Sequence, residues 1–140
     1  FSVAYIPFLE DNYAYFIIDH ETGEVAVVDP ADPITVIESL KILSNQLFNH
    51  KKLILTSILC THKHMDHAGG NSYLKKYYPN IHIISGIHEK VSSQTIFLSH
   101  QDIFQLGSTS IQLLDTPCHT IGHVAFYIQS SNSISNSTNN

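Results

Sequence analysis

The segment Thr61–Gly70 reads THKHMDHAGG and gathers metal-binding side chains into one short stretch. Three histidines and an aspartate fall within it: His62, His64, Asp66 and His67. Imidazole nitrogens and carboxylate oxygens are ligands that zinc and the neighbouring first-row metals accept. The His-x-His pair points two side chains the same way as the chain leaves a strand, so both rings can bind one ion. Asp66 and His67 follow directly and can hold a second ion beside the first.

The flanking residues place this segment between a strand and a helix. The apolar run Leu53–Leu59 predicts a buried strand before it. Gly69, Gly70 and Asn71 suit a tight turn and a helix start after it. A polar loop that is rich in histidine by chance is the alternative. Because ligand types, spacing and strand-to-helix context agree, the sequence favours a metal site.

Residues 115–123, DTPCHTIGH, form a second histidine-bearing segment. Pro117 keeps the chain extended, and His119 projects from it as the natural third histidine for the first ion. Three histidines with one open position are typical of catalytic zinc sites, whereas closed structural sites more often use cysteines. His123 is a second candidate, which we interpret as structural. The other histidines have no ligand spacing and are interpreted as surface or strand-end residues: His20, His50, His82, His88 and His100.

The start of the chain predicts a meander followed by a helix. Runs rich in aromatic and β-branched residues predict three antiparallel strands, over Val3–Leu9, Tyr13–Asp19 and Val25–Asp29. The pair Asp32–Pro33, a cap followed by proline at the first helical position, predicts a helix that runs to about Leu47. Its apolar residues recur at helical spacing and indicate one buried face.

The rest of the chain continues to alternate. Residues 87–93 are ambiguous and can form a helical turn. The other predicted elements are a helix over Ser72–Tyr78, a strand over Ile81–Ser85, a hairpin over Asp102–Leu114 and a last strand over Val124–Gln129. Alternating strands and helices in the middle, with antiparallel strands at the ends, favour an α/β layered domain.

Length and composition restrict the domain count and the partners. A chain of 140 residues predicts one domain. We assign it residues 1–129, with the polar stretch 130–140 as a flexible tail or a loop cut before the next element. A net charge of −5 with seven Lys and Arg argues against nucleic acid as a partner. No apolar run is long enough for a membrane span, and the start carries no targeting pattern. Because the sequence begins at Phe1 and not at a methionine, a targeting segment before Phe1 is an open alternative.

The two cysteines, Cys60 and Cys118, each adjoin one of the histidine-bearing segments. Two cysteines do not make a disulfide framework in a chain of this size. We expect two small buried thiols in a reducing compartment. A disulfide or a redox switch is the alternative. We expect a cytoplasmic protein, with an organelle as the other option.

These motifs carry a resemblance to a known family. THKHMDHAGG matches the pattern Thr-His-x-His-x-Asp-His-x-Gly-Gly of the metallo-β-lactamase superfamily. Within that superfamily the chain resembles glyoxalase II, the hydroxyacylglutathione hydrolases. The further stretches that carry the likeness are DNYAY at 11–15, VVDPAD at 27–32 and TPCHTIGH at 116–123. The first and last of these separate glyoxalase II from true lactamases. The resemblance extends from Val3 to about Gln129.

The resemblance implies an αββα sandwich with a two-metal site between its sheets, of which this chain is the N-terminal half. Carried over residue by residue, the ligands of the first ion are His62, His64 and His119. The ligands of the second ion are Asp66 and His67, and Asp66 also orients the attacking water as the catalytic carboxylate. Asp29 becomes a residue that helps to hold the metal-binding turn.

The implied activity is metal-dependent hydrolysis of a glutathione thioester, S-D-lactoylglutathione, to D-lactate and glutathione, a step of methylglyoxal detoxification. Two divalent ions, zinc first and iron or manganese as alternatives, activate the water that attacks the thioester carbonyl. The family continues beyond this chain with an aspartate that bridges both metals, a further histidine and a C-terminal glutathione pocket. We therefore expect these 140 residues to hold one ion or none, to show little or no activity, and to self-associate through an exposed apolar sheet face.

Three other interpretations stay open. A persulfide dioxygenase with a single iron shares the fold, but its pattern normally lacks the last histidine, so His123 favours glyoxalase II. A non-catalytic metal-binding or regulatory domain would suit the short chain. A lactamase or nuclease of the same fold is disfavoured by the start motif and the low basic content.

Overall fold

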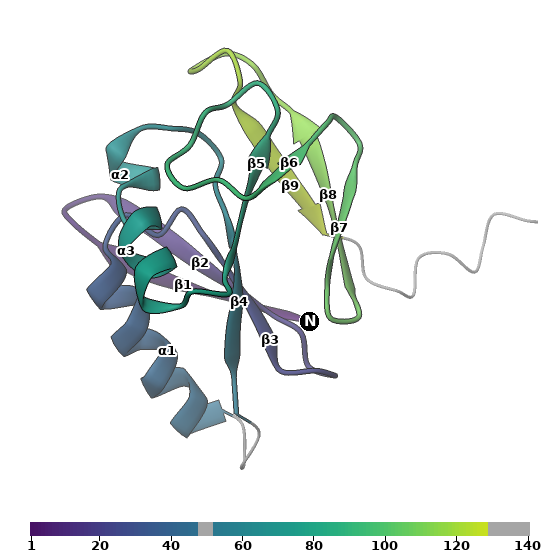
Figure 1. Ribbon diagram of the computed structural model, residues 1–140. Coiled ribbons are helices and arrows are strands. Elements are labelled where there is room, and N and C mark those ends of the chain that lie inside the picture. Colours follow the sequence, from purple (N-terminus) through teal and green to yellow (C-terminus); the bar gives the residue numbers. More distant parts are fainter. Residues whose placement is uncertain (48–51, 129–140) are drawn as a thin grey trace, which may run out of the picture.

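The computed structural model describes residues 1–47 and 52–128, which form three layers (Figure 1). A six-stranded sheet lies in the middle, with strand order β1-β2-β3-β4-β5-β6. Its strands are Ser2–Phe8, Asn12–Ile18, Glu24–Val28, Ile54–Leu59, His82–Gly86 and Ile96–Leu98. A second sheet holds β7 (Ile103–Leu106), β8 (Thr109–Asp115) and β9 (Val124–Ile128), in that order. The helices are α1 (Pro33–Leu47), α2 (Met65–Ala68) and α3 (Asn71–Tyr77).

The helices cover one face of the large sheet, and the second sheet packs against the other (Figure 1). One core lies under the helices and includes Phe16, Ile58 and Leu74. The other lies between the sheets and includes Ile17 and Leu59. Because the central strands are covered on both faces, four of the six residues of β4 are apolar. The predicted α/β layered domain is confirmed, and the described residues make the helix–sheet–sheet part of the expected αββα sandwich.

Strand pairing agrees with the expected meander and places the metal-binding segment. β1, β2 and β3 pair in antiparallel fashion, whereas β3 to β6 are parallel. The predicted helix after Asp32 is present, and its cap is confirmed because Asp32 accepts hydrogen bonds from the amides of Ile34 and Thr35. The metal-binding segment follows β4, so it lies at the carboxyl edge of the parallel strands.

Two local expectations were incomplete or wrong, and one glycine of the metal-binding segment has a further role. The metal-binding segment contains a short helix, α2, that was not predicted. Residues 87–93 form turns rather than a helical turn, and the three-residue strand β6, which was not predicted, follows them. The expected turn is present at Gly69 and Gly70, where Gly70 has φ −84° and ψ −10°. Gly70 is needed because a Cβ there would collide with the carbonyl oxygen of Pro30. Packing, which a local pattern does not encode, decides these features.

Some of the chain lies outside this description. The predicted end of the domain at residue 129, the tail at 130–140 and His50 are outside the described residues. Within residues 1–47 and 52–128, no helix is long and apolar enough to cross a membrane.

A buried carboxylate joins the two sheets at the end opposite the histidines. Asp19, at the end of β2, accepts hydrogen bonds from Thr22 in its own turn. It also accepts bonds from Ser108 and Thr109 of the β7–β8 hairpin, at 2.7 Å from each hydroxyl. Burial opposes ionisation of Asp19, but the bonds from Ser108, Thr22 and Thr109 outweigh it and hold the pKa well below its ordinary value.

We expect Asp19→Asn to lower the free energy of unfolding by about 1–3 kcal/mol at pH 7, because an amide cannot accept all of these bonds. A depressed pKa contributes stability above its ordinary value of about 3.9, and this contribution is lost as the pH falls through the native pKa. The deficit should therefore shrink below about pH 4 in urea unfolding measured by circular dichroism. Asp102→Asn, in the same hairpin, is the control. A deficit that stays constant down to pH 2 would contradict the assignment.

Candidate metal centre

Two turns meet where the two sheets end. The first follows β4 and carries His62, His64, Asp66 and His67, and the second joins β8 to β9 and carries His119. Main-chain pairing holds them together, since the Val124 amide donates to the Thr61 carbonyl at 3.0 Å. Residues that are far apart in sequence therefore form one cluster.

The three predicted ligands of the first ion converge. Ligand atoms of His62, His64 and His119 all lie within 4.8 Å of one another. His64 Nδ1 and His119 Nε2 are 3.0 Å apart. The imidazole rings of His62 and His119 have their centroids 4.9 Å apart. This spacing allows three nitrogens to bind one ion.

The protonation state of His62 suits a ligand. Its Nδ1 lies 2.9 Å from the Thr61 hydroxyl. Its Nε2 is buried and has no hydrogen-bond partner. Burial, together with the nearby His67, lowers the pKa of His62 to about 4, so the ring is neutral at physiological pH. An unpartnered buried nitrogen is costly unless another group satisfies it, so the residues present fit a metal ion.

Asp29 holds the first turn in place. It lies at the end of β3 with a positive φ of 49°, which is uncommon outside glycine but tolerated by aspartate. The Thr61 amide donates to Asp29 Oδ1 at 2.8 Å, and the Thr61 hydroxyl donates to Oδ2 at 2.6 Å. His67 Nδ1 lies 3.0 Å from the same Oδ2. Both carboxylate oxygens therefore have partners in the turn.

Asp66 and His67 lie together beside this first cluster. His67 Nε2 is 3.4 Å from Asp66 Oδ2, and both groups are partly exposed. Asp29, His62 and His67 also form a group with ligand spacing. We interpret Asp29 in that group as an anchor, because Thr61 and His67 Nδ1 already occupy its oxygens. His67 Nε2 and the Asp66 carboxylate, which are 3.4 Å apart, are not bonded by Asp29 and are the candidate ligand atoms.

Residues that were not predicted support the site from other elements. Asn12, at the start of β2, donates to the Asp66 carbonyl at 2.7 Å and to its carboxylate at 3.4 Å. Asn12 belongs to the DNYAY stretch, which the sequence analysis singled out. That stretch did not predict the contact between Asn12 and Asp66. Glu89, after β5, contacts the turn at Lys63. No sequence pattern indicated Glu89.

Among the residues that the structure describes, 1–47 and 52–128, the other histidines and the cysteines lie outside the ligand groups. His123 Nδ1 is 2.8 Å from the Thr116 hydroxyl, and the structural role of His123 stays a prediction. Cys60 is buried, and burial together with Asp29 raises the pKa of its thiol to about 12. Cys118 is exposed, so the expectation of two buried thiols was wrong for it. It lies in the surface turn that carries His119. Both cysteines are free.

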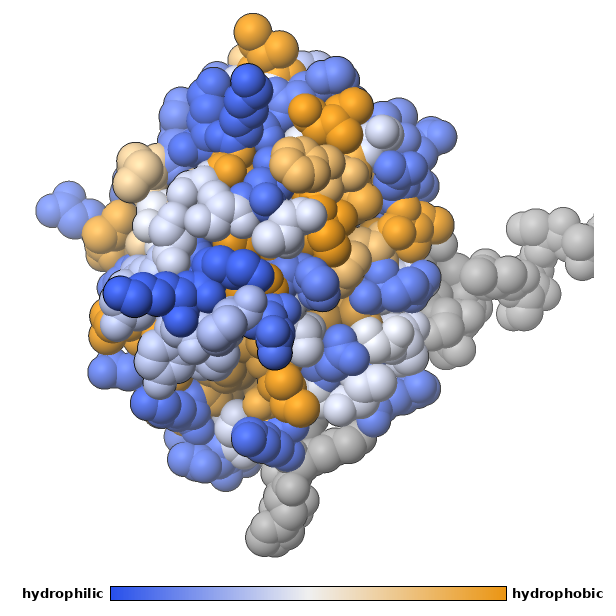
Figure 2. Space-filling model, viewed as in Figure 1, coloured by the Kyte–Doolittle hydropathy of each residue, from blue (hydrophilic) through white to orange (hydrophobic). Residues whose placement is uncertain are grey.

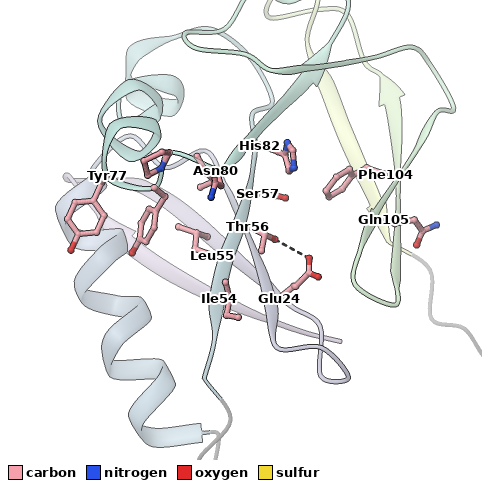
Figure 3. Close-up of a pocket in the computed structure, with 13 residues that line it drawn as sticks. Glu24, Ile54, Leu55, Thr56, Ser57, Tyr77, Asn80, His82, Phe104 and Gln105 are labelled. Atoms are coloured by element: carbon pink, nitrogen blue, oxygen red, sulfur yellow. Dashed lines mark hydrogen bonds between the residues drawn. The ribbon is translucent and has the colours of Figure 1, made fainter.

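A separate pocket of about 530 Å³ lies away from the histidines (Figure 3). It is lined by residues of β4 such as Ile54, by His82 at the beginning of β5, and by Phe104 of the second sheet. The histidine cluster follows the opposite end of β4. In the pocket wall, the Thr56 hydroxyl donates a hydrogen bond to the Glu24 carboxylate at 3.2 Å. The metal centre is thus defined by side-chain chemistry and not by this cavity.

The layered fold and the converging imidazoles define a metal-binding α/β sandwich protein. Comparison with known sequences makes the class specific: residues 9–133 match the metallo-beta-lactamase superfamily, and the chain belongs to it. Membership implies that the cluster binds a divalent metal. ETHE1 from Myxococcus xanthus has the same fold, with a TM-score of 0.69 and 24% identity over 83% of this chain and 48% of that one.

Two curated relatives are closer in sequence. A cytoplasmic hydroxyacylglutathione hydrolase of Arabidopsis thaliana is 42% identical over 128 residues, which span 91% of this chain and 46% of the relative. A probable hydroxyacylglutathione hydrolase of Schizosaccharomyces pombe is 39% identical over 88% of this chain and 46% of its own length. The chain thus spans about half the length of these relatives.

The Asp29–His67 contact can be tested in metal-free protein. The bond to Asp29 raises the pKa of His67, although burial opposes it. A raised pKa contributes stability that is complete below the ordinary value of about 6.5 and is lost as the pH rises through the native value. Asp29→Asn should lower the pKa of His67 in an NMR titration, because asparagine tolerates the same backbone conformation but carries no charge. Asp102→Asn should leave it unchanged. An equal pKa in wild type and Asp29→Asn would refute the assignment.

Proposed function

We propose that this chain forms the metal-binding part of a thioester hydrolase that converts S-D-lactoylglutathione to D-lactate and glutathione. The convergence of His62, His64 and His119 from two separate turns carries the proposal. The names of the two curated relatives support the choice of a glutathione thioester. The Arabidopsis relative is named cytoplasmic, and we propose the same location for this protein.

We assign a role to each residue of the proposed centre. A divalent ion bound by the three histidines would lower the pKa of water and polarise the thioester carbonyl. His62 is already neutral, so it binds without releasing a proton near neutral pH. The Asp66 carboxylate lies 3.4 Å from His67 Nε2 and can orient the attacking water or accept its proton. The leaving thiolate needs little acid assistance, because thiols are much more acidic than alcohols.

The second ion would be held less firmly in this chain. Asp66 and His67 are its candidate ligands, and Asp66 is half exposed. Two protein ligands satisfy only half of a tetrahedral zinc coordination shell. Zinc is the proposed metal, with iron and manganese as alternatives, because all three accept imidazole and carboxylate ligands.

We expect the 140-residue protein to bind a single zinc ion through the three histidines. His119→Ala should weaken zinc binding about 100-fold or more, because it removes one of three ligands. Competition with a chromophoric chelator measures the affinity, and elemental analysis gives the stoichiometry. His82 is exposed and begins β5, away from the cluster. The control variant His82→Ala should therefore bind zinc like wild type. Equal zinc affinity in wild type and His119→Ala would sink the proposed centre.

We expect lactoylglutathione hydrolysis by these 140 residues to stay near the background rate, because the second ion has two ligands among the described residues. The rate is measured with zinc added, from the decrease in the ultraviolet absorbance of the thioester. The Arabidopsis relative is the positive control. Turnover in the ordinary enzyme range, about 1–10³ per second, would show that the chain needs no further ligands.

The same measurements separate the competing interpretations. Zinc binding without any hydrolysis, even in a chain extended to the length of the relatives, would favour a non-catalytic metal-binding domain. Oxygen consumption with a persulfide substrate and iron would favour a dioxygenase. We favour the hydrolase because the relatives that match at 39–42% identity carry that name.

We also propose that the chain self-associates through apolar surface at the open sides of the sandwich. A cleft of about 320 Å³ between β9 and the first strands is lined by Val3, Tyr15, Ile17 and Phe126. Figure 2 shows hydrophobic residues gathered over β6 and the neighbouring second sheet, where Phe97 is 58% exposed. Contiguous apolar surface of this kind favours association between proteins.

The double substitution Val3→Ser and Tyr15→Ser should shift the protein toward monomer, because these side chains are 54% and 42% exposed beside the cleft. Sedimentation velocity over a range of concentrations measures the change. Tyr73→Ser removes a tyrosine from α3 that is 48% exposed and should leave association unchanged. A wild-type protein that is a stable monomer at every concentration would contradict the proposal.

A further inference from the structure

Glu89 is a buried carboxylate between the two ligand-bearing turns. It follows β5, and only 2% of its surface is exposed. Within residues 1–47 and 52–128, it forms no ion pair with a cationic side chain. Burying an unpaired carboxylate is costly unless hydrogen bonds satisfy it. The bonds that Glu89 accepts are therefore central to its role.

Each oxygen of Glu89 contacts a different turn. Oε1 accepts a hydrogen bond from the Lys63 amide at 2.9 Å. Lys63 lies between His62 and His64, so this bond fixes the backbone that carries both rings. Oε2 accepts a bond from the Thr120 hydroxyl at 3.1 Å. Thr120 follows His119 directly and is itself buried.

The second turn packs closely against Glu89. A Cβ atom at Gly122 would collide with the Glu89 carboxylate and the His88 carbonyl oxygen. Glycine at this position therefore lets the backbone of the His119 turn approach the carboxylate. Glu89 is fixed in turn by its own amide, which donates to the Gly86 carbonyl at 3.2 Å.

We propose that Glu89 is a positioning residue that sets the separation of the two turns, so that His62, His64 and His119 can share one ion. Its side-chain hydrogen bonds go to the Lys63 amide and the Thr120 hydroxyl, so it acts through these groups. The proposal rests on the proposed metal centre for its functional meaning, but the hydrogen bonds on which it depends exist in the metal-free protein.

The first test is zinc affinity, measured by chelator competition in purified protein. Glu89→Ala should weaken binding about 10–100-fold, in the range found when groups behind a ligand are removed. Thr120→Val should weaken it less, because it removes one of the two bonds. The double variant should bind no more weakly than Glu89→Ala, since both changes break the same connection. Cobalt-substituted Glu89→Ala should also show altered visible absorption, which reports coordination geometry.

Two further variants separate positioning from charge and from general destabilisation. Glu89→Gln keeps an acceptor for Lys63 and offers a donor to the Thr120 hydroxyl, so its affinity should stay within about threefold of wild type. Gln94→Ala is the matched control. Gln94 lies in the same connection between β5 and β6 and donates to the Ser85, Gly86 and Ile96 carbonyls of these strands. It should lower stability without changing zinc affinity.

A metal-free measurement keeps this inference distinct from the proposed function. Hydrogen exchange of the Lys63 amide should accelerate in Glu89→Ala and stay slow in Glu89→Gln and Gln94→Ala. Unchanged exchange in Glu89→Ala would overturn the inference whether or not the protein binds zinc. If wild type binds zinc, equal affinity in wild type and Glu89→Ala would overturn it, and so would a Glu89→Gln variant as weak as Glu89→Ala. Failure of wild type to bind zinc would instead overturn the proposed centre, and the exchange result would still decide the inference.

Discussion

The hydrogen bonds that Asp29 accepts are the interaction on which the metal centre depends. A turn of several polar residues has little apolar surface of its own to hold one conformation. Asp29 supplies that constraint from the end of β3, where its two oxygens accept bonds from the Thr61 amide and hydroxyl. His67 is held by the same carboxylate. The unusual backbone conformation of Asp29 is tolerated because these contacts stabilise it.

The sandwich brings the second turn to the first. β4 lies in the large sheet and β8 in the small one, and their carboxyl ends meet at one edge of the molecule. The apolar core between the sheets fixes their relative position. Asp19 bonds the sheets together at the opposite end, through Ser108 and Thr109. Glu89 bonds the turns together near the histidines. Buried carboxylates therefore join both ends of the sandwich.

Much of the local structure could be predicted from residue patterns. The cap at Asp32, the meander and the hairpin at Gly107 follow from turn chemistry and alternating apolar residues. Short elements were missed: α2 has four residues and β6 has three, too few to show a period. The exposure of Cys118 was also missed, because burial of a turn residue depends on what packs over it.

The sequence by itself determined which side chains can bind a metal, since ligand type and the spacing of His62, His64, Asp66 and His67 are properties of one continuous segment. It also indicated His119 as the partner from a second segment. The tertiary structure decided which groups hold these ligands. Asn12 reaches Asp66 across 54 positions, and Glu89 reaches Lys63 across 26. Such contacts exist only after the layers have packed, because no local pattern encodes which distant loop will lie beside a turn.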